Sequence, residues 1–435
     1  MKTNNFVLIA FVFFLLLSCN NEETTQIISS DIDNFWVAYD KINATNDTIL
    51  KRKYLKEHFI DKASIGQKKM FALRNYTPKE YLDVIKKYPK FWTSLRKNTL
   101  DFKPHNAEIL KGISKLRAVY PEMKNSSVYY TMGAFRSPGT GVDSTLILGS
   151  EFALGDLTIN TTEFKGDKEH IIAYHNIDPL KYLQSLSIHE YIHTQQNFPV
   201  YNILSWTLYE GIAEFIGTHL TEQKSPWSAF KYGPENEKFV KDTYEHQLFD
   251  SGNMDNWLWS NNNQFGHRDL GYYVGYSIAK IYYENSKDKS LAIKQLIELD
   301  YEDETEVERI VNSTNYLSGT LAALYKSYET NRPQVLGIKQ FKNGSLDVDA
   351  SIKLVTIQFS KPMNPDRRGF DFGPLGRENA MIMTKYIGFS EDKTEVRFEV
   401  NLEPNKKYQL QLPSKFMDTS GLFIKPYLID FHTGK

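Results

Sequence analysis

Apolar residues three and four positions apart dominate residues 31–123 and return in residues 178–328. This spacing places apolar side chains along one face of an α-helix, so both stretches are predicted to be mostly helical. Thr77 followed by Pro78 is typical of a helix start, because Thr caps the first backbone N–H groups and Pro suits the first turn. Residues 107–120 continue the helical pattern on a stripe formed by Ile109, Leu110, Ile113, Leu116 and Val119.

Two other parts of the chain alternate between apolar and polar residues, as β-strands do. Residues 127–132 and 144–148 are predicted to be strands of a small sheet, with a loop at residues 136–141 between them. Past Pro333, short alternating runs are separated by Pro, Asn, Asp and Gly, and they cover residues 352–359, 395–400, 408–412 and 428–431. These runs predict a small all-β sandwich.

The predicted fold class is therefore α+β in two parts. Residues 31–332 form a mostly helical domain with a small β-sheet, divided into a helical N-terminal part (31–123) and a core that carries the chemistry (124–290). Residues 333–435 form the β-sandwich.

The N-terminus has the pattern of an export signal. Lys2 precedes an apolar run of 12 residues (6–17), which is shorter than the about 20 residues of a membrane-spanning helix. Ser18 stands directly before Cys19, the one cysteine of the chain. This arrangement resembles the lipobox of bacterial lipoproteins, which implies a signal peptide at residues 1–18, acylation of Cys19, and a tether at residues 19–30. We expect a lipid-anchored protein that faces the periplasm or the cell exterior.

Composition and charge narrow the classes of function. Hydrophobic residues make up 41% and charged residues 24%, which excludes a disordered or collagen-like chain. Lys and Arg number 52 against 53 Asp and Glu, so no overall positive charge attracts nucleic acid, and no nucleic-acid partner is expected. One cysteine cannot form a Cys-rich zinc site. Composition leaves the oligomeric state open.

The segment 178–197 carries the candidate chemistry. Asp178 and Pro179 predict a helix start, and Pro199 predicts its end. Within this helix lies His189-Glu190-Tyr191-Ile192-His193, an HExxH motif. Residues four apart share one face of a helix, so both imidazoles can bind one Zn²⁺ at about 2.0–2.1 Å. Glu190 lies beside the metal, where a general base for the attacking water is needed.

A catalytic zinc ion needs a third protein ligand and one open position. The metzincin pattern HExxHxxGxxH is excluded, because Gln196 and Pro199 occupy its Gly and third His positions. The next predicted helix offers Glu210 and Glu214, four residues apart on one face of an otherwise apolar segment. Two carboxylates in such a setting favour a bound cation.

Here the sequence resembles the gluzincin metallopeptidases, in which HExxH is followed one helix later by an NEGxAE-like segment. The segment Tyr209-Glu210-Gly211-Ile212-Ala213-Glu214 is similar to it. The resemblance implies that Glu210 is the third zinc ligand and that Glu214 orients a ligand histidine. The gap after His193 is slightly shorter than in the large aminopeptidase branch, which leaves Glu214 as the alternative ligand.

A third predicted helix, residues 270–283, holds the candidate oxyanion donor. The resemblance implies a Tyr three residues before a Gly, and Tyr272 stands three residues before Gly275. A phenol near the metal can share the negative charge that develops on the substrate carbonyl. Tyr276 and His267 are alternatives for the same role, and packing alone is the other interpretation of this tyrosine-rich helix.

Upstream, residues 145–148 are the expected edge strand for a substrate main chain. The Gly-Ala-Met-Glu-Asn segment of the aminopeptidase branch is missing there, so aminopeptidase specificity is not expected. Residues 125–290 resemble predicted zinc-dependent proteases of bacterial lipoproteins, and a gliding-motility lipoprotein family is similar in layout. In the last part, Phe359-Ser360-Lys361-Pro362-Met363 resembles the opening FSxPM of bacterial Ig-like domains, whose usual roles are spacing and recognition.

The sequence therefore predicts a membrane-anchored zinc metallopeptidase acting on a peptide or protein. His189, His193 and Glu210 are the expected zinc ligands, Glu190 is the general base and Tyr272 the oxyanion donor. The alternative is a non-catalytic surface binding or assembly lipoprotein that keeps a zincin scaffold. The substrate, and whether cleavage is internal or terminal, stay open.

Overall fold

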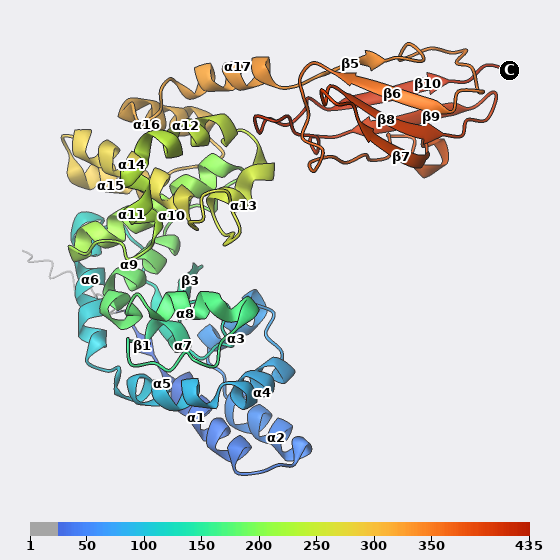
Figure 1. The fold of residues 1–435 in the computed structure, drawn as a ribbon. Helices are drawn as coiled ribbons and strands as arrows, with labels where there is room; N and C mark the ends of the chain where they lie inside the picture. The colour runs from blue at the N-terminus through green and yellow to red at the C-terminus, as the bar shows by residue number, and fades with distance from the viewer. Residues whose placement is uncertain (1–24) are drawn as a thin grey trace, which may run out of the picture.

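The structure is a computed structural model that describes residues 25–435. The predicted signal peptide, Cys19 and the first half of the predicted tether (residues 19–24) lie outside the described residues. The architecture is α+β, as the sequence predicts: helices dominate from the N-terminal end to α17 (Leu321–Asn331), and an antiparallel β-rich part follows (Figure 1). Hydrophobic residues form two separate cores, one within residues 32–321 and one within residues 338–431.

Six α-helices and a short π-helix (Lys56–Ile60) build the N-terminal part. The α-helices are α1 (Ser30–Asn43), α2 (Thr48–Leu55), α3 (Ile65–Leu73), α4 (Pro78–Lys87), α5 (Pro89–Asp101) and α6 (His105–Val119). The predicted cap is confirmed, since the Thr77 hydroxyl accepts a hydrogen bond from the Glu80 backbone N–H at 3.2 Å. The predicted tether is wrong at its end, because Ile27–Ile28 form strand β1 and α1 begins at Ser30.

A four-stranded sheet follows these helices in the order β1-β2-β4-β3. Strand β2 (Ser127–Thr131) pairs in parallel with β1 and with β4 (Thr145–Gly149). Strand β3 (Gly139–Val142) is antiparallel to β4 and forms one edge of the sheet. The two predicted strands are confirmed, but the loop predicted at 136–141 is wrong from Gly139 onward, since the backbone there pairs with β4.

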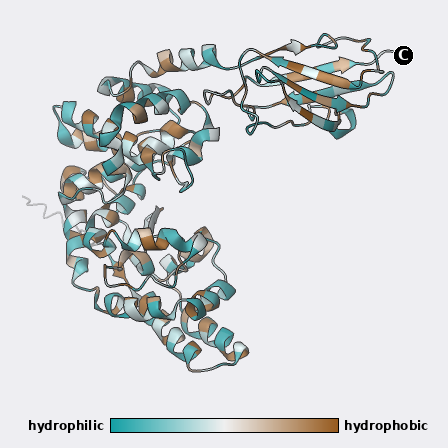
Figure 2. Cartoon of the chain, viewed as in Figure 1, coloured by the Kyte–Doolittle hydropathy of each residue, from teal (hydrophilic) through white to brown (hydrophobic). Residues whose placement is uncertain are grey.

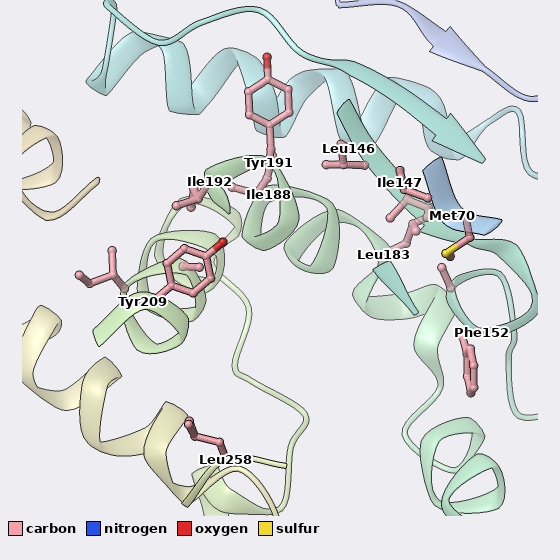
Figure 3. Close-up of a cluster of buried hydrophobic side chains, with 14 of the residues drawn as sticks. Met70, Leu146, Ile147, Phe152, Leu183, Ile188, Tyr191, Ile192, Tyr209 and Leu258 are labelled. Atoms are coloured by element: carbon pink, nitrogen blue, oxygen red, sulfur yellow. The ribbon is translucent and has the colours of Figure 1, made fainter. Parts of the chain in front are cut away.

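The helix that carries HExxH is α9 (Leu183–His193). Its predicted start is wrong: Asp178 has a left-handed backbone (φ 58°), makes no capping hydrogen bond and precedes a short 3₁₀ turn, Pro179–Tyr182. The predicted end near Pro199 is also too late, because α9 stops at His193. Figure 3 shows Ile188, Tyr191 and Ile192 of α9 in the buried cluster that includes Leu146 and Ile147 of β4.

Helices α10 (Ile203–Thr221) and α14 (Leu270–Asn285) cross at very short range. A Cβ atom placed on Gly275 would overlap the Thr207 carbonyl oxygen, and one on Gly211 would overlap the backbone of Gly275. The helices can approach this closely because both positions are glycine. The crossing brings Glu210 of α10 and Tyr272 of α14 to the same cleft. The other helices of this part are α7 (Ser150–Ala153), α8 (Glu169–His175), α11 (Ala229–Glu235), α12 (Glu237–Gln247), α13 (Met254–Trp257), α15 (Lys289–Ile297) and α16 (Glu304–Thr314).

The β-rich C-terminal part contains a four-stranded antiparallel sheet and a two-stranded one. The first has the order β5-β6-β8-β7 and the second pairs β9 with β10. All four predicted runs become strands, and two strands were not predicted. The bounds are β5 (Val335–Ile338), β6 (Leu354–Phe359), β7 (Met383–Phe389), β8 (Glu395–Val400), β9 (Lys407–Leu412) and β10 (Tyr427–His432).

Hydrophobic and hydrophilic residues are interspersed along the helices (Figure 2). Within residues 25–435, none of the helices combines the length and the apolar character needed to cross a bilayer.

Candidate metal centre

Two imidazoles and one carboxylate converge at the end of α9. The Nε2 atoms of His189 and His193 lie 3.0 Å apart, one helical turn from each other on the same face. Glu210 Oε2, from the first half of α10, lies 3.4 Å from His189 Nε2 and 3.3 Å from His193 Nε2. The side chains of His189, His193 and Glu210 are only 9%, 6% and 11% exposed. Across residues 25–435, no other set of three His, Cys, Asp or Glu residues brings its donor atoms this close together.

The spacing fits the requirements of a metal ion. Ligands about 2.0–2.1 Å from a tetrahedral centre are about 3.3 Å apart. The three donor atoms here are 3.0, 3.3 and 3.4 Å apart. All three residues also line a cleft. His189, His193 and Glu210 could therefore bind one metal ion.

The outer nitrogens of both imidazoles have fixed partners. His189 Nδ1 lies 2.9 Å from Glu214 Oε2, and His193 Nδ1 lies 2.8 Å from Gln196 Oε1. The amide nitrogen of Gln196 donates to the Tyr209 carbonyl at 3.0 Å, so its oxygen is the atom that faces the histidine. Both partners accept hydrogen bonds, and this assigns the proton of each neutral ring to Nδ1.

With the Nδ1 protons assigned, three lone pairs meet at the centre of the cluster. Neutral His189 and His193 both point an Nε2 lone pair inward, and Glu210 adds a carboxylate oxygen. Three acceptors at this range need a cation between them, either a proton or a metal ion. Burial disfavours the charge on His189, but hydrogen bonds with Glu210 and Glu214 together raise its pKa above the ordinary value. Burial likewise opposes the charge on Glu210, yet the two histidines hold its pKa well below the usual range.

Glu190 is not one of the donors and lies to one side of them. A Cβ atom on Gly139 of β3 would lie 2.9 Å from Glu190 Cγ and 3.1 Å from its Oε1, so the carboxylate packs against this strand. Burial raises the pKa of Glu190, while the nearby histidines oppose the rise. Its carboxylate lines the same cleft as the donor atoms. Glu190 therefore borders the cleft in which His189, His193 and Glu210 meet.

The cleft has a volume of about 870 Å³. It is lined by residues of α9, by residues of α8 and of the segment 136–142 that includes β3, and by residues of α10, α14 and the segment 259–269. Figure 1 shows these two groups of elements on opposite sides of α9. The wall beside His193 is aromatic, with Phe198, Trp206, Tyr209 and Trp259. Such a cleft has room for several residues of a peptide.

Of the three candidate oxyanion donors, only Tyr272 lines the cleft among the described residues. Its ring is parallel to that of His189, with centroids 6.2 Å apart. Burial, and then the charge of Glu210, raises the pKa of Tyr272, so its hydroxyl keeps its proton at neutral pH and can donate. Tyr276 packs instead against Phe215 and Phe230. His267 stacks on Tyr232.

The prediction that residues 145–148 form the edge strand for the substrate is wrong. Residues 145–149 form β4, which pairs with β2 on one side and β3 on the other, so it has no free edge. The strand that borders the cleft is β3, and its other edge has no partner in the described part of the chain. Two glycines let β3 cross α9 directly, since a Cβ on Gly141 would lie 2.8 Å from His193 Cβ and one on Gly139 would meet Glu190.

Gln196, Arg268 and Asp269 are among the residues at the site that were not assigned a role from the sequence. Gln196 follows His193 by three positions, a spacing that places it on the same side of the chain and could have suggested a partner. Asp269 and Arg268 form an ion pair with a separation of 3.0 Å on the cleft wall. Burial raises the pKa of Asp269 to about 7. No sequence pattern marks this pair, because it comes from a loop that only the fold places there.

No protein-family description and no curated protein matches the chain. Among solved structures, CopC from Methylosinus trichosporium OB3b is 14% identical, with 24% of this chain and 94% of CopC covered and a TM-score of 0.20. The surface layer protein SbsC, domains 1–6, is 14% identical, with 63% of this chain and 42% of SbsC covered and a TM-score of 0.18. At these TM-scores neither likeness bears on fold or function.

Proposed function

We propose that the chain is a membrane-anchored, gluzincin-like zinc metallopeptidase. The observation that carries the proposal is the convergence of His189 Nε2, His193 Nε2 and Glu210 Oε2 within 3.4 Å of one another at the floor of a cleft. Two imidazoles and a carboxylate are a donor set that catalytic zinc uses. Glu214 and Gln196 supply the outer hydrogen bonds that such ligands need.

The chain's own residues supply the rest of the chemistry. Bound zinc would contribute Lewis acidity, which polarises a carbonyl and lowers the pKa of water. Glu190 takes the proton of the attacking water and passes it to the leaving amine, a role that suits its raised pKa. The Tyr272 hydroxyl donates to the carbonyl oxygen as negative charge develops on it.

Strand β3 supports a peptide as the substrate. Its free edge borders the cleft beside Glu190, so an extended main chain can pair with it as an added strand. That pairing would hold a peptide carbonyl over the donor atoms, and it would not depend on the side chains of the peptide. The lipobox-like Cys19 supplies the proposed membrane anchor, and the β-rich C-terminal part is proposed to be an Ig-like spacer or recognition domain.

The test is zinc content together with peptide cleavage. Elemental analysis of the purified protein should give about one zinc ion per chain, and a mixed peptide library should be cut by the zinc-loaded form. If zinc binds and nothing is cut, the non-catalytic binding lipoprotein is the better description. If no divalent metal binds, the zinc metallopeptidase and the zinc-binding, non-catalytic lipoprotein are both wrong.

Removing Glu210 and removing Glu214 should have different effects on zinc. Glu210→Gln deletes a ligand and is expected to abolish stoichiometric zinc binding. Glu214→Gln keeps all three donors and loosens only the hydrogen bond to His189 Nδ1, so zinc affinity should fall about 10–100-fold. Competition with a chromophoric chelator measures both. The reverse ranking would make Glu214 the third ligand.

Zinc affinity should weaken as the pH falls. The raised pKa of His189 means that, without metal, this ring holds a proton at neutral pH that zinc must displace. Affinity is then expected to fall about tenfold for each pH unit below that pKa. Calorimetry at pH 7 in buffers of different ionisation enthalpy should show the release of at least one proton. An affinity that is constant between pH 8 and pH 6 would contradict this expectation.

A further inference from the structure

Arg74 lies beside the start of β3, the strand that borders the cleft. It follows the last residue of α3, and its guanidinium lines the cleft. Arg74 Nη2 donates to the Ser137 hydroxyl at 3.0 Å, and that hydroxyl donates to the Gly139 carbonyl at 2.6 Å. Gly139 is the residue that packs against Glu190. Two hydrogen bonds therefore link Arg74 to the strand segment beside the general base.

Arg74 differs from the other arginines of the cleft in its charge environment. Arg136 is paired with Glu80 at 2.7 Å, and Arg268 with Asp269 at 3.0 Å. Among residues 25–435, Arg74 has no carboxylate within ion-pair distance (4.0 Å), and the acidic group on which its charge acts is Glu190, whose pKa it helps to lower. Its Nε atom is buried and makes no hydrogen bond. A guanidinium has five N–H donors, and the bond to Ser137 uses one of them.

We propose that Arg74 binds a carboxylate of the peptide substrate and gives the cleft a preference for acidic peptides. The inference rests on the proposed peptidase function. A peptide paired along β3 passes the Ser137–Gly139 end of the strand, where the unpaired guanidinium lies. Arginine suits this role because its planar fork matches a carboxylate. The carboxylate comes from an acidic side chain or from the C-terminus of the peptide.

Binding without turnover separates this proposal from the proposed activity. The protein for the assay is the zinc-loaded full chain with Glu190→Gln, and fluorescence anisotropy reports binding of labelled peptides. One peptide pair differs only in Glu or Gln at a single position, scanned along the peptide. The second pair differs only in a free or an amidated C-terminus. The carboxylate member of at least one pair should bind about 10–100-fold more tightly, as for a charge-assisted hydrogen bond.

Adding Arg74→Gln should reduce that affinity ratio to about one, and Arg74→Lys should retain part of it. Lys69→Gln is the matched control: it removes one positive charge from α3, but Lys69 is bound to Asp143 and Thr145. Its ratio should stay as in the parent. Ser137→Ala tests whether Arg74 only supports β3, because it breaks the link to the strand and keeps the guanidinium.

Equal binding of both members of every pair would overturn the proposal, and so would a Ser137→Ala protein that loses the preference as Arg74→Gln does. A carboxylate preference in a protein whose wild type cuts no peptide would support the Arg74 assignment and contradict the peptidase. Cleavage without any carboxylate preference would support the peptidase and contradict the Arg74 assignment. If no peptide binds, both are wrong.

Discussion

Replacing Glu190 with Gln is expected to reduce peptide cleavage by about a thousandfold while zinc stays bound. Gln is nearly the same size but cannot take a proton from water, and general-base catalysis contributes about 10²–10⁴-fold. Zinc should be retained because Glu190 is not one of the three convergent donors. Initial rates on one cleaved peptide, with zinc measured in the same samples, give both quantities.

The matched control for this substitution is Glu222→Gln. Glu222 follows the end of α10, is exposed and pairs with Lys115 at 3.2 Å, away from the cleft. Its cleavage rate should match that of the wild type within about twofold. A Glu190→Gln protein that keeps more than a tenth of the activity would show that another group takes the proton. Loss of zinc in that variant would show that Glu190 is a ligand.

Gly275→Ala is expected to have the largest effect on stability of any single methyl group added to the helices. The new Cβ would overlap the Thr207 carbonyl oxygen, and Gly211 lies directly opposite. Backbone on both sides cannot rotate away as a side chain could, so α10 and α14 must separate. Overpacking of this kind costs about 3 kcal/mol. Denaturant unfolding followed by circular dichroism measures the loss.

Gly319→Ala is the control for this change. A Cβ there would meet nothing closer than Ala323 Cβ at 3.8 Å, which is ordinary contact. Its unfolding midpoint should stay close to that of the wild type. If Gly275→Ala were equally harmless, the short α10–α14 crossing would be wrong. The relative positions of Glu210 and Tyr272, which these helices carry, would then be wrong as well.

The ligand geometry was predictable where it depends on one helix. His189 and His193 share a face because four residues make about one turn, and the structure places their Nε2 atoms 3.0 Å apart. The helical spacing made Glu210 and Glu214 candidates, only the resemblance to gluzincins favoured Glu210, and the structure brings Glu210 to the same point. Tyr272 reaches the cleft, but its distance in sequence from α9 gave no physical reason to prefer it to Tyr276.

The errors concern features that tertiary contacts decide. Asp178 has good capping chemistry, yet it takes a left-handed backbone and a 3₁₀ turn follows, so the helix begins later. Residues 139–141 (Gly-Thr-Gly) have the composition of a loop, but the missing side chains of Gly139 and Gly141 are what let β3 lie across α9. Arg74 lies more than a hundred residues before the HExxH motif, and only the fold brings it to the cleft.

The most direct test of the central claim is a crystal structure of the zinc-loaded protein with anomalous data recorded on both sides of the zinc edge. We predict one strong zinc peak within bonding distance, about 2.0–2.2 Å, of His189 Nε2, His193 Nε2 and a Glu210 oxygen. That peak should have one further side open to the cleft. The absence of a peak there, or a peak ligated by Glu214 in place of Glu210, would contradict the account.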